Sequence, residues 1–405
     1  MNAPAATAPT LTRRLLDGTG TDGAAHLARY GALPHLRLDD LLQAVTDSGL
    51  TGCGGGGFPT AAKVRAVAAG SQRPVVVGNG MEGEPLSSKD AVLLTHNPHL
   101  VLDGLEVLAR AMHAKRAVLA VAPGINPGPA TSAARGRRLD VVQLEGGFIA
   151  GQETALVNQL DGRPAVPRDP FTRVTDSGVG GRPTLVLNAE TLAQVALVAR
   201  YGADWFRSVG IGGDPGTSLF TITGSVATSG VVEAERGSVL RQVLAPAEPL
   251  RPAAVLVGGY HGAWVPVSDL DVRLTNGDLA PYQASVGAGI LHVLDVGTCP
   301  LDFAADVLGY LAGESARQCG PCLNGLPRLA TDLKRLAVGV RDPHLPAEVQ
   351  RMSAVVTGRG ACAHPDGTAR FVASTLDVFR GHVSAHLGGW CPSGRQPRRV
   401  GRAAS

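Results

Sequence analysis

A run of glycines is the first stretch of this chain whose residue types could do chemistry. Residues 52–60 read Gly-Cys-Gly-Gly-Gly-Gly-Phe-Pro-Thr, and a helical pattern that includes Lys63 follows directly. Consecutive glycines can take positive φ and approach a bulky ligand closely, and backbone N–H groups ahead of a helix suit a phosphate. A flexible linker is the alternative for a glycine run alone. The Phe-Pro-Thr exit into a helix favours a phosphate-bearing cofactor.

Thiols form the second group. Cys319 and Cys322 make a C-x-x-C motif, and Cys362 lies further along the chain. Two thiolates at this spacing and a remote third can share one metal ion or iron–sulfur cluster. A thioredoxin-like redox pair is a second interpretation, although the motif lacks a βαβ context. Buried cysteines that act as small apolar residues are a third. Spacing alone leaves all three open.

Carboxylates form the third group. Glu82 and Glu84 lie in a turn-rich segment after an apolar run, and Glu153 lies in a helical pattern that follows a loop. Taken singly, each is typical of a solvated surface residue. Their positions past expected strand ends make them candidates for a polar rim around a cofactor.

Composition limits the class of protein. The 405 residues are 44% hydrophobic and 18% charged, which is typical of a soluble globular chain of two or three domains. A net charge of +3 without a basic face argues against nucleic-acid binding. No apolar run reaches the roughly 18 residues of a membrane span, so no direct membrane insertion is expected. The few cysteines and the lack of a signal-peptide pattern predict a cytoplasmic protein.

The elements that would position the glycine loop begin with a β–α–β pattern. Short, β-branched apolar runs predict strands at 74–77, 117–122 and 184–188, with a helix at 99–113. This alternation predicts a doubly wound α/β domain, whose ligands bind beyond the carboxyl ends of the strands. Residues 1–40 look like a loose lead-in to this domain.

The pattern changes twice further along the chain. Residues 214–298 begin with hairpin chemistry and continue with short strand patterns, which predicts a small α+β module. Beyond residue 300, four stretches carry apolar residues at helical spacing and predict a helical bundle: 303–311, 326–336, 346–356 and 368–387. The basic tail at 393–405 is expected to be disordered.

The chain contains five motifs that resemble, in the same order, those of the NADH-binding flavoprotein subunit of respiratory complex I. Relatives of that subunit occur in formate dehydrogenases and bidirectional hydrogenases. Residues 48–63 look like the family's S-G-L-x-G-R-G-G-A-G-F-P-T-G-x-K, and residues 79–90 look like N-A-D-E-G-E-P-G-T-x-K-D. Residues 151–156 are similar to G-E-E-T-A-L, and residues 188–191 to N-V-E-T. Residues 314–325 look like E-S-C-G-x-C-x-P-C-R-x-G.

The resemblance covers most of the chain and implies a fold. It implies an α/β FMN-binding and NADH-binding domain over 1–213, then a β-grasp module of the soluble-ligand-binding type over 214–298. A helical iron–sulfur domain with a 4Fe-4S cluster would follow over 299–392. The implied activity is that of an NAD(P)H dehydrogenase: the nucleotide gives a hydride to FMN, and single electrons pass to the cluster and a ferredoxin-like partner.

The resemblance also implies the roles of single residues. The glycines of the loop and Lys63 would hold the FMN phosphate and edge, Phe58 the nicotinamide nucleotide, and Glu84 would lie near the NADH face. The complete set of implied cofactor contacts is Gly52, Gly54, Gly55, Gly57, Phe58, Lys63, Asn79, Glu82, Glu84, Glu153 and Asn188. The implied cluster ligands are Cys319, Cys322 and Cys362. No residue acts as a general acid or base in this scheme.

Four positions depart from the family pattern. Cys53 stands in place of an Arg, Met81 in place of an Asp, and Leu187 in place of an Asn. Ala316 stands in place of the first cluster cysteine and cannot ligate iron.

The missing ligand leaves several outcomes open. Cys391, His364 or an exogenous group could complete the cluster site, or the cluster could be three-iron, labile or absent. A degenerate, non-catalytic scaffold or binding subunit is therefore the alternative function. A relationship to the Rnf or corrin-reductase electron-transfer subunits is a further one, although the segments around Glu84 and Glu153 favour the complex I type.

Overall fold

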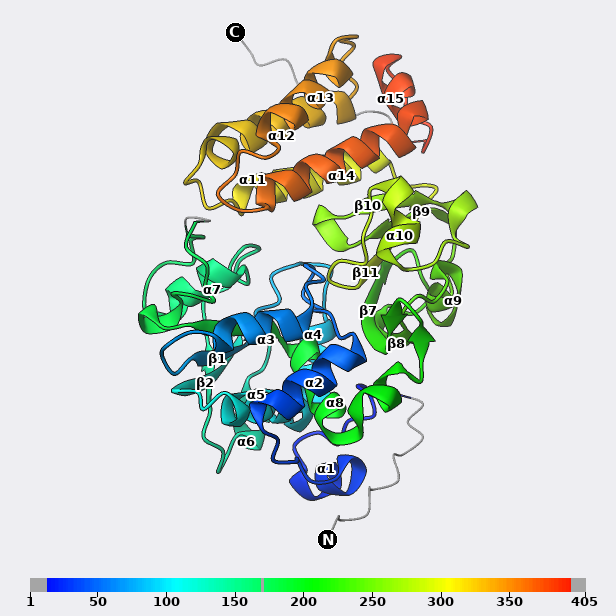
Figure 1. Cartoon of the computed structure of the whole chain (residues 1–405). Coiled ribbons are helices and arrows are strands. Elements are labelled where there is room, and N and C mark those ends of the chain that lie inside the picture. The colour runs from blue at the N-terminus through cyan, green and yellow to red at the C-terminus, as the bar shows by residue number, and fades with distance from the viewer. Residues whose placement is uncertain (1–12, 169–170, 395–405) are drawn as a thin grey trace.

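The structure is a computed structural model that describes residues 13–168 and 171–394 (Figure 1). Most of the basic tail therefore lies outside the described residues. The chain begins in an α/β region at the bottom of Figure 1, continues through a second sheet, and ends in a group of helices at the top.

The first region is built on four parallel strands. Their order in the sheet is β3 (Asp140–Gln143), β2 (Arg116–Val121), β1 (Val75–Gly80), β4 (Thr184–Asn188). The central strands are almost continuously apolar and buried, as expected for a parallel sheet covered on both faces. The predicted α/β sheet is thus present, and the unpredicted β3 extends it at one edge.

Helices surround this sheet, and two of them pack especially closely. The helices are α1 (Gly23–Tyr30), α2 (Leu38–Ser48), α3 (Thr60–Ala68), α4 (Lys89–His96), α5 (Pro98–Ala111), α6 (Gly128–Ala133), α7 (Glu153–Leu160) and α8 (Ala189–Arg207). A Cβ on Gly104 of α5 would lie 1.8 Å from the carbonyl oxygen of Leu192 on α8, so only glycine permits this approach. The expected loose lead-in at 1–40 is wrong in part, because it contains α1 and the buried side chains of Leu15 and Tyr30.

The second region is a five-stranded mixed sheet. Its strand order is β10 (Ala263–Pro266), β9 (Pro252–Val257), β11 (Ile290–Asp295), β7 (Thr217–Gly224), β8 (Gly230–Glu235). The β7–β8 pair is the predicted antiparallel hairpin, whereas β11 runs parallel to β7. The short elements of this region are β5 (Gly210–Ile211), β6 (Asp214–Pro215), α9 (Leu240–Leu244) and α10 (Asn276–Leu279).

The third region is helical and covers one side of the second sheet. Its helices are α11 (Pro300–Gly313), α12 (Leu326–Ala337), α13 (Leu345–Val356), α14 (His364–Val378) and α15 (Arg380–Leu387). Trp264 of β10 packs against Phe303 and Phe371 in a shared core. The single helix predicted at 368–387 is wrong, because the chain leaves helical geometry at Phe379 (φ −106°, ψ 32°). Among the described residues, no helix is both long and apolar enough to span a membrane.

Candidate cofactor-binding site

The carboxyl ends of β1 and β4 bring several predicted residues together. Asn79 and Asn188 are register partners on these neighbouring strands. The side-chain amide of Asn79 donates to the Gly151 carbonyl at 2.9 Å, and that of Asn188 donates to the Asn79 carbonyl at 3.4 Å. The strands β2 and β3 lie on one side of β1, and β4 lies on its other side. The strand order therefore reverses between β1 and β4, and α/β proteins bind ligands at such a switch point.

A lysine from the helix after the glycine loop reaches the same edge. Lys63 on α3 forms an ion pair with Glu153, the first residue of α7, at 2.9 Å between Nζ and Oε1. Its ammonium also donates to the Val186 carbonyl of β4 at 2.9 Å. Both charged side chains remain partly exposed, so they are available to a ligand. The structure thus brings two of the predicted cofactor contacts, Lys63 and Glu153, together.

The glycine loop presents exposed backbone donors. Its base is closed by a hydrogen bond from the Gly52 amide to the Phe58 carbonyl at 2.9 Å. Gly55 and Gly57 take φ of +105° and +57°, which other residues rarely adopt. Residues 53–56 form a tight turn, and within the described part of the chain the amides of residues 54–57 donate to no acceptor outside the loop. They are exposed together with the Phe58 ring and suit an anionic group.

Cys53 is a neutral anchor of this loop instead of a charged ligand. Its amide donates to Thr191 Oγ1 of α8 at 2.9 Å. Burial raises the pKa of the Cys53 thiol to about 12, and the nearby Glu190 carboxylate adds to the effect. The thiol is therefore uncharged at neutral pH and does not replace the cation that the family pattern carries here.

Arg236, which follows β8, supplies a different cation beside the loop. Its Nη2 donates to Thr51 Oγ1 at 2.9 Å, and its Nε lies 3.2 Å from a carboxylate oxygen of Asp214. Its Nη1 is buried and has no hydrogen-bond partner among the described residues. Sequence reasoning missed Arg236 because only the packing of the second sheet against the loop brings it there.

A cavity of about 580 Å³ lies between the glycine loop and the second sheet region. The predicted Gly52, Gly55 and Gly57 line it, together with Arg236 and Glu190. Its volume is in the range of small-molecule sites. The other predicted contacts, at the strand ends, are not among its lining residues.

The two acidic residues of the segment after β1 have different surroundings. Glu82 accepts from the amides of Asp90 and Ala91, both at 3.1 Å, and so caps α4. Burial, and then repulsion from the Asp90 carboxylate, raises the pKa of Glu82. Glu84 accepts from the Tyr260 amide at 3.0 Å, and burial raises its pKa to about 7. Its Oε1 is buried without a partner among the described residues.

A buried network of charged side chains holds the Asn188 side chain in place. The ammonium of Lys89 lies 2.8 Å from Asp90 Oδ1, 3.0 Å from Glu190 Oε2 and 3.1 Å from Asn188 Oδ1. Burial alone would lower the pKa of Lys89, but the two carboxylates outweigh it and raise it. Lys89 lies inside the second motif of the resemblance, but the sequence alone gives it no role.

The predicted cluster thiols lie near one another at the helical region. Cys322 lies in a π-helical turn (Pro321–Gly325) ahead of α12. Burial acts to raise the pKa of Cys319, but backbone N–H groups of Ala361 and Cys322 outweigh it and lower it. Such donors stabilise thiolates at iron–sulfur sites. Burial raises the pKa of Cys322 to about 12, and the Cys319 and Cys362 thiols contribute.

Neither of the two suggested substitutes for the missing ligand stands free at that site. His364 uses both ring nitrogens: Nδ1 lies 3.1 Å from His261 Nε2, and Nε2 lies 2.8 Å from the Leu311 carbonyl. Cys391 belongs to a different group, with Cys299 and His386.

Comparisons with known proteins agree with this geometry. Residues 45–197 match the family model described as the Nuo51 FMN-binding domain, and residues 302–386 match the NADH-ubiquinone oxidoreductase-F iron-sulfur binding region. The chain is 32% identical over 381 residues to an NADH-quinone oxidoreductase subunit of Streptomyces coelicolor, covering 87% of this chain and 84% of the relative. The chain belongs to the Nuo51 family of NADH-quinone oxidoreductase subunits.

Other relatives and solved structures extend this match. An NADH-quinone oxidoreductase subunit of Rhizobium meliloti is 29% identical over 392 residues, which are 90% of this chain and 93% of the relative. A chain of the crystal structure of NAD+-reducing [NiFe]-hydrogenase in the H2-reduced state is similar, with a TM-score of 0.79 and 32% identity. That match covers 86% of this chain and 63% of the hydrogenase chain, so this chain spans less than two thirds of it.

The residues present fit the groups that the Nuo51 family implies. The exposed loop amides and the unpaired Nη1 of Arg236 suit a phosphate, and the unpaired Oε1 of Glu84 suits a polar nucleotide group. Three thiols suit three corners of a cluster. The resemblance and the FMN-binding α/β domain inferred from the sequence are confirmed. Ala316 supplies no thiol at the position where the family pattern carries its first cluster cysteine.

Proposed function

We propose that this chain is an NADH-oxidising FMN flavoprotein that passes electrons to an iron–sulfur cluster. Its membership of the Nuo51 family carries the proposal, because the predicted contacts from four separate motifs meet at one edge of the β1–β4 pair. FMN supplies the chemistry that nicotinamide lacks, since it accepts two electrons together and releases them singly.

The chain's own residues hold and orient the reactants. The amides of residues 54–57, with Arg236 beside them, bind the phosphate of the flavin nucleotide. Lys63, Asn79, Glu153 and Asn188 contact the rest of that nucleotide at the strand ends. Phe58 and Glu84 face the nicotinamide nucleotide. Rate enhancement then comes from the positioning of donor and acceptor.

Three further assignments complete the proposal. Cys319, Cys322 and Cys362 ligate the cluster, and an exogenous donor occupies the corner opposite Ala316. The second region is a β-grasp module of the soluble-ligand-binding type, with domain limits at 1–213, 214–298 and 299–392. The helical region is a helical bundle. It delivers electrons to a ferredoxin-like partner protein in the cytoplasm.

Flavin and iron measured on the same anaerobic sample test the proposal. About one FMN per chain is expected, together with NADH-dependent reduction of ferricyanide. Lys63→Met should lower flavin retention by about tenfold, because it removes the ion pair to Glu153 and a cation at the strand ends that contacts the nucleotide. Lys115→Met, which removes an exposed lysine, is the matched control.

The opposite result would favour the non-catalytic alternative. A chain that neither contains FMN nor binds it on reconstitution would be a scaffold, as the changes at Cys53, Met81, Leu187 and Ala316 suggest. The family matches do not favour that role. Flavin without iron would leave a simple flavoprotein and reject only the cluster assignment.

A further inference from the structure

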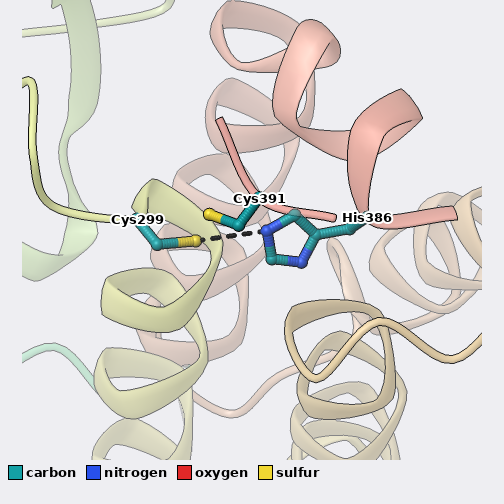
Figure 2. A group of neighbouring side chains, drawn as sticks. All are labelled: Cys299, His386 and Cys391. Carbon is teal, nitrogen blue, oxygen red and sulfur yellow. Dashed lines mark hydrogen bonds between the residues drawn. The ribbon is translucent and has the colours of Figure 1, made fainter. Parts of the chain in front are cut away.

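A second group of metal-ligating side chains lies away from the cofactor site. Cys299, His386 and Cys391 place their two Sγ atoms and a ring nitrogen within 4.8 Å of one another (Figure 2). All three are buried, with 1%, 1% and 8% of their surface exposed. They come from the start of α11, from α15, and from the segment after α15. Residues distant in sequence therefore converge on one point.

The imidazole is oriented as a ligand. His386 Nδ1 lies 3.2 Å from the Leu336 carbonyl, which can only accept, so Nδ1 carries the proton. The other nitrogen, Nε2, then presents its lone pair toward Cys299 Sγ at 3.4 Å (Figure 2). A ring N–H bonded to a backbone carbonyl is the usual support of a metal-bound histidine, because it fixes the tautomer and the direction of the ring.

The spacing also matches a metal centre. In a tetrahedral zinc site the Zn–S distance is about 2.3 Å and the Zn–N distance about 2.0 Å, so a sulfur ligand and a nitrogen ligand lie about 3.5 Å apart. The observed separation of Cys299 Sγ and His386 Nε2 is 3.4 Å. Two thiolates and one imidazole are a ligand set that zinc prefers over magnesium or calcium.

We propose that Cys299, His386 and Cys391 bind a zinc ion that ties the segment after α15 to the start of α11. Water occupies the fourth position, because the group contains three ligands among the described residues. Binding releases the two thiol protons and reduces nothing, so no redox partner is needed. The site is separate from the cluster thiols and does not depend on the proposed function.

Metal analysis of the purified full-length chain tests this proposal. About one zinc per chain is expected after growth with Zn²⁺, and Cys299→Ser or His386→Gln should lower zinc content by about tenfold or more. Cys53→Ser, which removes a buried thiol elsewhere, should leave zinc unchanged. Cys319→Ser should lower iron while zinc stays, so failure of the cluster assignment and of the zinc assignment can be told apart.

A second measurement does not depend on the folding of variants. Zinc is removed from the unmodified chain and replaced by Co²⁺, which should produce the visible absorption of cobalt bound by thiolates. Equal zinc in the Cys299→Ser and parent chains would overturn the proposal. So would iron at this position, or an intact mass that shows a Cys299–Cys391 disulfide in the freshly isolated protein.

Discussion

Single residues show that the glycine loop keeps its shape although the cation beside it comes from a different position than in the family pattern. Cys53 has lost the charge that the family pattern places on the loop, and its buried thiol is neutral. Arg236, from the second sheet region, brings a guanidinium to the same loop through Thr51. The sequence comparison reveals the loss, but only the three-dimensional structure reveals the neighbouring cation.

Glu84 should make stability depend on pH. Burial raises its pKa in the folded chain from 4.5 to about 7. Below about pH 4.5 the carboxyl is protonated in both states and contributes nothing. As the pH rises toward 7, the unfolded chain loses this proton first, so stability falls by up to about 3 kcal/mol and stays lower above it. Glu84→Gln removes this loss and keeps an acceptor for the Tyr260 amide.

Urea unfolding at two pH values measures the effect. Glu84→Gln should be more stable than the parent chain at about pH 8, and the two should be nearly equal at about pH 4.5. A loss of stability of the same size at both pH values would show that the side chain acts through packing alone.

Ala316→Cys should improve the cluster site. A fourth thiol completes the ligand set whose other members are Cys319, Cys322 and Cys362, so iron per chain and the lifetime of the cluster in air should both rise. Ala330→Cys on α12 adds a thiol of similar exposure outside the motif and serves as the control. Iron content that rises equally in both variants, or in neither, would contradict the assignment.

At the scale of elements, α8 is the part that links the core to the site. Its first residues follow Asn188 and include Thr191, which holds the glycine loop. Its position is set by α5, because Gly104 lets the two helices approach. Packing inside the domain therefore controls the geometry of the loop.

Gly104→Ala should disturb both stability and cofactor binding. The added methyl group would meet the Leu192 carbonyl, so a loss of about 1–3 kcal/mol or more is expected, together with weaker FMN retention. Gly309→Ala is the control, because a Cβ there meets nothing within 4 Å in an exposed position of α11. It should raise stability by up to about 1 kcal/mol. Thermal unfolding measures the change in stability. After ultrafiltration, flavin fluorescence in the filtrate measures the FMN that the chain has released. Equal behaviour of the two variants would refute the packing argument.

Across the whole molecule, local sequence patterns predicted the helices and strands that depend on residues close together in the chain. The strands predicted at 74–77 and 184–188 from β-branched runs are β1 and β4, although β1 continues to Gly80, beyond the predicted end. Their pairing brings Asn79 and Asn188 together. The break at Phe379 was missed, because apolar spacing continues through it.

Groups formed by distant segments were also missed. Arg236 at the loop and the cluster of Cys299, His386 and Cys391 exist only once separate regions have packed. No spacing rule connects residues that tertiary packing alone brings together.

The contact between the first and second regions supports the last prediction. Glu233 of β8 accepts from the backbone amides of Arg14, Leu15 and Leu16 at 3.0, 2.9 and 3.1 Å. The Arg14 side chain continues the connection, with a 2.9 Å bond to the Phe206 carbonyl at the end of α8. One carboxylate thus attaches the start of the described chain to the second sheet.

Glu233→Ala should therefore loosen the junction of the two regions. It leaves three amides without their acceptor, so the free energy of opening this junction should fall by about 3 kcal/mol. Hydrogen exchange at residues 14–16 should speed up by about tenfold or more, while exchange in β1 and β4 changes little, because the loss is local. Glu235→Ala, two positions along the same strand, removes an exposed carboxylate that accepts from the Gly210 amide and leaves these three amides paired. If both variants accelerated exchange at 14–16 equally, general weakening of β8 and not the Glu233 carboxylate would hold the regions together.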